Sequence, residues 1–133
     1  MSEFHVIEIS LNDQQALVDA LVELGYTPTV YKEAKNLYGY QGDKRSQKAH
    51  VIIPRRQVGS VSNDVGFERK SDGSFIMHLS EYDERSKTFN VKKMKQLYAK
   101  NRITKALKKK SKYRLSNQKV EKDGRIVMRV RVG

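Results

Sequence analysis

Apolar and polar positions alternate in short runs along much of the first ninety residues, a pattern typical of β-strands. The run EFHVIEI at 3–9 alternates in this way, with Phe4, Val6 or Ile7, and Ile9 competing for the buried face. Further strand-like runs are TPTVY, NLYGYQG, KAHVIIP, DVGFERK and SFIMHLSEY. The last two are joined by SDGS, whose Asp-Gly is a strong hairpin signal, and KDGR joins YRLSNQKVE to RIVMRVRV in the same way near the C-terminus.

A helix is predicted directly after the first strand. Asn12, followed by Gln15, has the form of an N-terminal capping box, and the leucines that follow form an apolar stripe that stops at Gly25. Many short strands with hairpin turns and few helices predict an α+β domain with a largely antiparallel sheet and helices on one side. A chain of 133 residues, 38% of them hydrophobic, can bury one modest core, so we expect a single domain over residues 1–133.

A second helix is predicted over 91–114, where two apolar stripes are out of phase. At about 100° per residue, the stripe from Val91 to Tyr98 and the stripe from Ala99 to Leu107 lie on nearly opposite faces. One straight helix cannot bury both stripes against a single sheet. We therefore expect a kink or a split within 99–102, with Asn101 as a new cap, before the C-terminal hairpin.

The net charge of +12 is concentrated in one segment. Residues 1–84 hold 9 basic and 13 acidic side chains, residues 85–120 hold 14 basic and none acidic, and residues 121–133 hold 4 and 2. A localised basic block beside a mildly acidic body creates a directional field that attracts a polyanion. The alternative interpretation of this basic segment is a lysine-rich helix face that is exposed to solvent and binds no ligand.

Five cations of the second helix lie within a narrow arc opposite its second apolar stripe: Arg102, Lys105, Lys108, Lys109 and Lys112. We call them the cationic row, which is about 10 to 15 Å long at a rise of 1.5 Å per residue. Such a row can engage several phosphates. Lysine predominates, which favours contact with the phosphate backbone over base reading. Tyr98 and Tyr113 flank the row and either stack on unpaired bases or complete the core.

Four further cations flank strand ends in the middle of the chain: Lys44, Arg45, Arg55 and Arg56, which we call the loop cations. Lys44 and Arg45 follow GYQG at 39–42, whose glycines allow close backbone approach or merely a tight bend. The spacing does not match a dinucleotide-binding or phosphate-loop pattern. We expect these cations to extend the basic patch if they lie on the same side as the helix.

Catalytic chemistry finds little support in the sequence. The chain has no Cys, and His5, His50 and His78 each lie in a strand-like run without metal-ligand spacing, which favours structural roles. The acidic cluster at 81–84 fits a helix-start charge or a partner for nearby lysines. We therefore expect no enzymatic activity, no cofactor and no metal. No apolar run is long enough to span a bilayer and the N-terminus lacks the order of a signal peptide, so we expect a cytoplasmic protein that does not enter membranes.

These features predict a non-catalytic nucleic-acid-binding protein that grips the phosphate backbone with little sequence specificity, with DNA and RNA left open. The alternative is a small adaptor or viral host-interaction protein that binds an acidic protein partner. That partner would need an apolar hot spot, for which Phe89, Tyr98 and Tyr38 are candidates.

The order of the segments FHVIEI, LVDALVELGY, LYGYQGDKRSQKAHVII, NDVGFERKSDGSFIMHLSEYD, KQLYAKNRITKALKKK and EKDGRIVMRVRV resembles an uncharacterised family, that of conserved plastid open reading frame 35. Its most specific pieces here are LGY, GYQG, DVGF and DGRIVMRV. Relatives of that family occur in algal plastid genomes, cyanobacteria and some viruses of microbes. The resemblance implies a fold and a setting, but it supplies no mechanism and no catalytic residue. This chain departs from the family in its more uniformly basic helix.

Overall fold

A computed structural model describes residues 3–115 of the chain, with the side chains of all of these except Ser10 and 109–115. Its elements, in chain order, are β1 (Phe4–Leu11), α1 (Gln14–Glu23), β2 (Thr29–Tyr38), β3 (Lys44–Ile53), α2 (Arg55–Val58), β4 (Val65–Arg69), β5 (Phe75–Ser80), α3 (Glu81–Ser86) and α4 (Val91–Leu115).

The strands form one antiparallel sheet in the order β1-β5-β4-β3-β2, so the predicted α+β class is confirmed. A hairpin joins β4 to β5 as expected, with Gly73 at a φ of 90° that favours glycine, but its turn is longer than the two residues that Asp-Gly predicts, since Lys70 pairs with Ser74. The second predicted hairpin lies outside the described residues. Beside the predicted N-terminal helix, α2 is a short helix that the sequence patterns did not indicate, and α3 is a short helix that begins at the acidic cluster.

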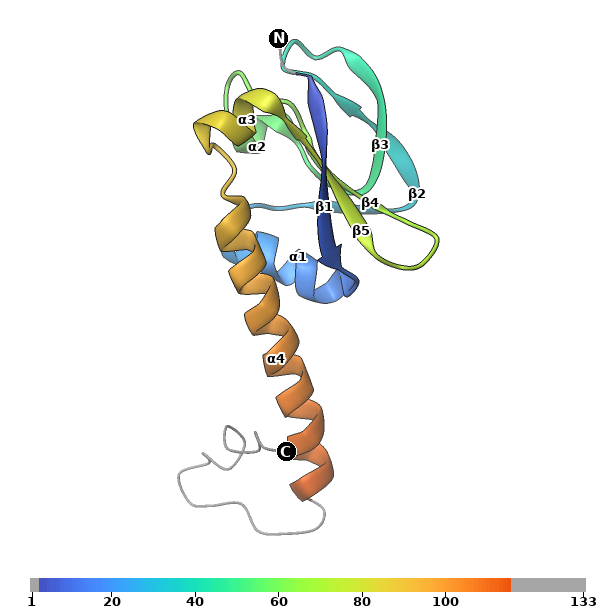
Figure 1. The fold of residues 1–133 in the computed structure, drawn as a ribbon, viewed down its shortest axis with the longest axis vertical. Coiled ribbons are helices and arrows are strands. Elements are labelled where there is room, and N and C mark those ends of the chain that lie inside the picture. The colour runs from blue at the N-terminus through green and yellow to red at the C-terminus, as the bar shows by residue number, and fades with distance from the viewer. Residues whose placement is uncertain (1–2, 116–133) are drawn as a thin grey trace.

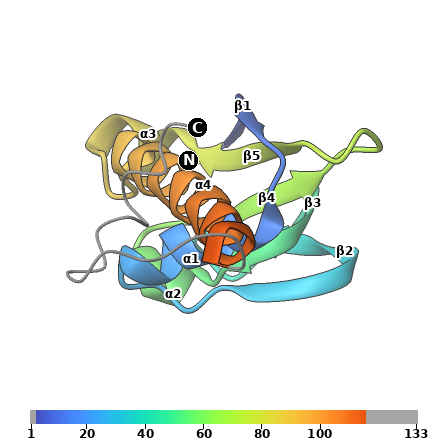
Figure 2. The same ribbon diagram turned by 90° about the horizontal axis from the view of Figure 1, so that it is seen from below.

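One face of the sheet carries the main core. Strand residues such as Val51, Phe67 and Met77 are fully buried there against Leu17 of α1 and Met94 of α4. Figure 2 shows α1 and α4 side by side over the sheet. Because strand side chains alternate between faces, every second residue of β3 to β5 supplies this core.

The β2–β3 ribbon bends over the opposite face of the sheet and encloses a smaller cluster. Leu37 and Ala49 are completely buried there, packed with Ile52. Gly66 permits this close packing, because a Cβ at Gly66 would lie 2.7 Å from the Cβ of Ala49 and 2.8 Å from Leu37. The absence of a side chain at one position of β4 thus allows the ribbon to approach the sheet.

The long basic helix is not kinked or split as expected. α4 is a single helix of 25 residues that begins after the cap residue Asn90, and Figure 1 shows its distal half extending away from the sheet and from α1. The prediction was wrong because it assumed that both apolar stripes are buried. Only the stripe from Val91 to Tyr98 packs against the body, whereas Ile103 of the second stripe is 61% exposed.

Candidate functional site

The first turns of α4 are held to the start of α1 by one buried phenol. The Tyr98 hydroxyl accepts hydrogen bonds from the backbone N–H groups of Asn12 and Asp13, each at 3.0 Å. It also accepts one from Nη1 of Arg102 at 3.2 Å. Tyr98 is only 6% exposed, so of the two roles open to it, completing the core is the one the structure shows.

The cap of α1 is Asp13, not Asn12 as predicted, and Asp13 also faces two cations of α4. Its Oδ1 accepts the Ala16 N–H at 3.0 Å, and its Oδ2 lies 3.0 Å from Nζ of Lys105 and 3.7 Å from Nε of Arg102. Partial burial opposes ionisation of Asp13, but the Ala16 N–H and the two cations outweigh it and lower the pKa of this carboxyl. One carboxylate thus partly neutralises two members of the cationic row.

The cationic row lies on the same face of α4 as the buried stripe, since a continuous helix keeps its phase beyond Tyr98. Arg102 and Lys105 therefore meet the body instead of facing away from it, although their side chains remain 48% and 51% exposed. Lys108 is exposed farther along the helix. The row positions 109 and 112 lie in α4, but their side chains, like Tyr113, are outside the described part of the structure.

The remaining described cations of α4 have few acidic neighbours. Lys100 pairs with Glu23 of α1 at 2.7 Å and lowers the pKa of that carboxyl. Among the described side chains, no ion pair involves Lys92, Lys93 or Lys95, all of which are exposed. The field of α4 is therefore strongly positive near the sheet as well as along its distal half.

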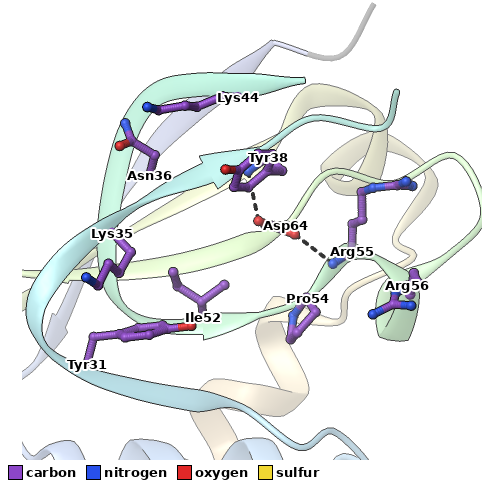
Figure 3. Close-up of a pocket in the computed structure, with 10 residues that line it drawn as sticks. All are labelled: Tyr31, Lys35, Asn36, Tyr38, Lys44, Ile52, Pro54, Arg55, Arg56 and Asp64. Atoms are coloured by element: carbon purple, nitrogen blue, oxygen red, sulfur yellow. Dashed lines mark hydrogen bonds between the residues drawn. The ribbon is translucent and has the colours of Figure 1, made fainter. Parts of the chain in front are cut away.

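A hollow of about 550 Å³ opens between β2, β3 and the start of α2 (Figure 3). We call it the β2–β3 hollow. Three of its cations are among the predicted binding residues and Tyr38 is a predicted hot spot for a protein partner, whereas neither Tyr31 nor Asp64 was indicated by the sequence. Its charged and aromatic lining residues are Lys35, Lys44, Arg55, Arg56, Tyr31, Tyr38 and Asp64.

Asp64 fixes two walls of this hollow. It is 7% exposed, and its carboxylate oxygens accept the backbone N–H of Tyr38 at 2.8 Å and that of Arg55 at 2.7 Å (Figure 3). Burial raises the pKa of Asp64, against the opposing effect of the two N–H groups and the Arg55 charge. Its neighbour Asn63, fully buried, accepts the N–H of Tyr40 at 2.8 Å. Two buried polar side chains thus hold the turn after β2 against the start of α2.

Arg45 does not belong to the hollow. Its guanidinium lies 5.8 Å from the centre of the Phe4 ring and pairs with Asp43. It also lies over Gly39, where a Cβ would meet the guanidinium, the flexible end of a side chain that can move aside. The tight bend is the role that the structure supports, since Gly42 has a φ of 80°.

The hollow and α4 lie on opposite faces of β3. Ile52 lines the hollow, whereas its neighbours Val51 and Ile53 belong to the core that includes Met94 and Tyr98 of α4. The loop cations therefore do not extend the patch on the helix. Three of them, Lys44, Arg55 and Arg56, form a second basic surface at the hollow, and Arg45 lies apart from both surfaces.

Each of the three histidines has a hydrogen-bond partner on a neighbouring element. His5 lies between two carboxylates of α3, with Nδ1 3.0 Å from Glu84 and Nε2 2.9 Å from Glu81. The hydrogen bonds to Glu84 and Glu81 raise the pKa of His5. His78 contacts Glu68 at 2.9 Å. His50 accepts the Arg69 N–H at 2.9 Å, and burial, followed by the nearby Arg69 charge, lowers its pKa.

The acidic cluster at the start of α3 acts as a helix start, one of its two predicted roles. Glu81, Asp83 and Glu84 occupy the first turn, where negative charge is favourable, and Ser80 caps the helix. Within residues 3–115, no group of three His, Asp or Glu side chains is arranged to hold a metal ion. In the same residues, no helix has the length and apolar character needed to cross a bilayer.

Two of the proposed hot-spot residues for a protein partner are buried, Phe89 at 1% exposure and Tyr98 at 6%, so that prediction was wrong for both. Tyr38 is 43% exposed. Sequence reasoning missed Ile103 as an exposed apolar side chain, because it assigned the second stripe to the core. It also missed Asp64 as a wall-forming carboxylate, since a single acidic residue before a strand carries no distinctive pattern.

Comparison with known protein families gives one match. The model of a family described as "Protein of unknown function (DUF1257)" matches residues 20–129, most of the chain. No curated protein and no solved structure matches. The finding supports the predicted membership of an uncharacterised family, while the resemblance to the plastid reading frame stays a prediction.

Proposed function

We propose that this chain, which belongs to the DUF1257 family, binds nucleic acid by its phosphate backbone through α4 and without catalysing a reaction. The supporting observation is the imbalance of charge on this helix. The segment 91–114 holds eleven Lys and Arg and no acidic residue, and the described carboxylates paired with it are only Asp13 and Glu23.

The shape of the helix supports the same proposal. The distal half of α4 leaves the sheet (Figure 1), so a polyanion can approach it without meeting the acidic body. Arg102 and Lys105 share one carboxylate and stay half exposed, which leaves a positive field at that point. The row continues through Lys108 to positions 109 and 112, which are lysines in the sequence. Lysine acts as a point charge, so the binding discriminates little between sequences.

A salt titration of binding to single-stranded and duplex DNA and RNA, followed by fluorescence anisotropy, tests the proposal. The logarithm of the affinity should fall linearly with the logarithm of the salt concentration, with a slope of about 0.9 per phosphate contacted on duplex DNA. The variant K108Q/K109Q/K112Q should lower that slope by about 2 to 3, the contribution of three contacts. These positions avoid Arg102 and Lys105, whose contacts with Asp13 would confound binding with stability.

The matched control is K92Q/K93Q/K95Q, which removes the same charge from the part of α4 nearest the sheet. A smaller loss in this control assigns binding to the distal row. Equal losses in both variants would show a diffuse charge effect without a site. Absence of binding at low salt would refute the proposal.

One observation favours a second candidate function, the binding of an acidic protein partner. Ile103 is 61% exposed on the face of α4 opposite the cationic row, with Leu107 partly buried on the same face. Apolar side chains spaced four residues apart on one face of a helix, as Ile103 and Leu107 are, are typical anchors of a helix that docks in a partner's groove. The variant I103S separates the two functions, since it should weaken a protein complex but leave the salt slope with nucleic acid unchanged.

A further inference from the structure

The β2–β3 hollow combines positive charge with exposed aromatic surface. None of its four cations, Lys35, Lys44, Arg55 and Arg56, forms an ion pair with a described side chain. Asp64, the one carboxylate among its lining residues, accepts the backbone N–H groups of Tyr38 and Arg55 and forms no direct ion pair with these cations. The lining of the hollow therefore holds four cations against one carboxylate and is positive overall.

The hollow is also preformed. Asp64 and Asn63 are buried polar groups, whose desolvation is unfavourable unless hydrogen bonds compensate it. They make these bonds to the backbone of Tyr38, Tyr40 and Arg55, and so fix the positions of the aromatic and cationic walls. The Gly42 turn is set against the same wall, since a Cβ there would lie 3.9 Å from Nη2 of Arg55. A ligand would meet side chains whose backbone needs little rearrangement.

The order of groups in the hollow indicates what class of ligand it fits. Tyr38 pairs with Lys44 across the hairpin and is joined to Arg55 through Asp64, so the ring lies between the two cations (Figure 3). An inorganic anion would use the cations alone. The volume of about 550 Å³ falls within the range of small-ligand sites, roughly 300 to 1,000 Å³. Arginine forks match phosphate oxygens, and an exposed tyrosine ring at 43% exposure offers a stacking face for a base.

We propose that the β2–β3 hollow binds a nucleotide unit, with its phosphate on Arg55 and Arg56 and its base stacked on Tyr38, while Lys44 on the far side of the ring adds to the positive field. The unit comes either from a free mononucleotide or from an unpaired residue of a single strand, because both present the same phosphate and base. This site is separate from α4, on the other face of β3, and it stands even if α4 does not bind phosphate.

Titration of the isotope-labelled full chain with adenosine monophosphate, uridine monophosphate, inorganic phosphate and a short oligouridylate, followed by NMR, tests this site. We expect saturable shifts of the amides of Tyr38, Lys44, Arg55 and Arg56. Saturation by a mononucleotide identifies the free nucleotide as a ligand, whereas saturation by the oligouridylate alone identifies an unpaired strand. The proposal is overturned if inorganic phosphate binds as tightly as the nucleotides, or if the shifts fall only on α4.

Substitutions separate the roles of charge and ring. R55Q/R56Q should weaken nucleotide binding by about tenfold or more, the effect of losing charge-assisted hydrogen bonds. The backbone N–H that Asp64 uses is retained in this variant, and the amide spectrum checks the fold. Y38L should weaken nucleotide binding severalfold without changing phosphate binding, and Y38F should change neither, since only the stacking face is needed. Equal binding by Y38L and the native chain would overturn the stacking role.

The helix variant K108Q/K109Q/K112Q is the control for independence. It should leave the affinity for a mononucleotide unchanged while it lowers the salt slope with longer strands. Loss of mononucleotide binding in this variant would overturn the assignment to the hollow. If the native chain shows the expected salt slope with nucleic acid but the amides of the hollow do not shift with nucleotide, the proposal for α4 is supported and the proposal for the hollow is refuted.

Discussion

Replacement of Tyr98 by Phe tests how α4 is docked on the body. The ring stays in the core, so packing is conserved, but the hydroxyl that accepts the N–H groups of Asn12 and Asp13 at 3.0 Å is lost. A buried donor without a partner costs about 1 to 3 kcal/mol. Because this site is only partly buried, we take the lower value for each N–H and expect a loss of about 2 kcal/mol in the free energy of unfolding.

Urea unfolding followed by circular dichroism measures this loss. With a slope of about 2 kcal/mol per molar urea, the midpoint should fall by about 1 M without a change in slope. Tyr82→Phe is the control, since Tyr82 is 37% exposed and its hydroxyl has no hydrogen bond among the described residues. That variant should change stability by less than about 0.5 kcal/mol.

A double-mutant cycle with Arg102→Gln sharpens the test. Arg102 donates to the same hydroxyl at 3.2 Å, so the two substitutions should be non-additive by about 0.5 kcal/mol or more. A loss below about 0.5 kcal/mol in Tyr98→Phe would mean that water replaces the hydroxyl. The reasoning that this phenol sets the phase of α4 would then be refuted.

Three further predictions concern other parts of the molecule. Gly66→Ala should lower the free energy of unfolding by about 1 to 3 kcal/mol, because the added methyl group overpacks against Ala49 and Leu37. Adding Ala49→Gly to this variant should restore part of the lost stability, measured by thermal unfolding. A Gly66→Ala variant as stable as the native chain would contradict the close packing of these residues. Asp13→Ala should lower the free energy of unfolding by about 1 kcal/mol, because the helix cap is lost. The same variant should bind nucleic acid more tightly at low salt, because Arg102 and Lys105 lose their carboxylate partner. An unchanged affinity would show that neither cation contacts phosphate. The pKa of His5 is raised by its contacts with Glu84 and Glu81, so these contacts stabilise the folded state fully below pH 6.5, the ordinary pKa of histidine, and this stabilisation is lost as the pH rises through the higher pKa of the folded state. In the variant Glu84→Gln, an NMR titration should show a lower pKa for His5. An unchanged pKa would show that Glu84 is not the cause of the shift.

Much of the candidate site was within reach of sequence reasoning. Lys44, Arg55 and Arg56 were selected from their positions at strand ends, and the structure brings them into one hollow. Arg45 was selected by the same criterion but lies over Phe4, since adjacent residues of a strand point to opposite faces. Tyr31 and Lys35 were not indicated, because their place in the hollow depends on the bend of the ribbon.

Local patterns in the sequence are sufficient to indicate several strands and the charge of the basic helix. Alternation and the Asp-Gly turn indicate β1, β4 and β5, because both signals can be recognised within each segment, although β1 pairs with the distant β5. The segregation of positive charge is likewise a property of composition alone.

The face of α4 that meets the body, and the side of the sheet that carries each basic surface, depend on contacts between distant parts of the chain. Periodicity defines two stripes on a helix, but contacts between residues distant in the chain choose between them. Core packing of Met94 and Tyr98, together with the Tyr98 hydroxyl on the start of α1, orients the first stripe toward the body, so Ile103 stays exposed and Arg102 reaches Asp13. In the same way Gly66 lets the β2–β3 ribbon close over the sheet, which places the hollow and α4 on opposite sides of one strand.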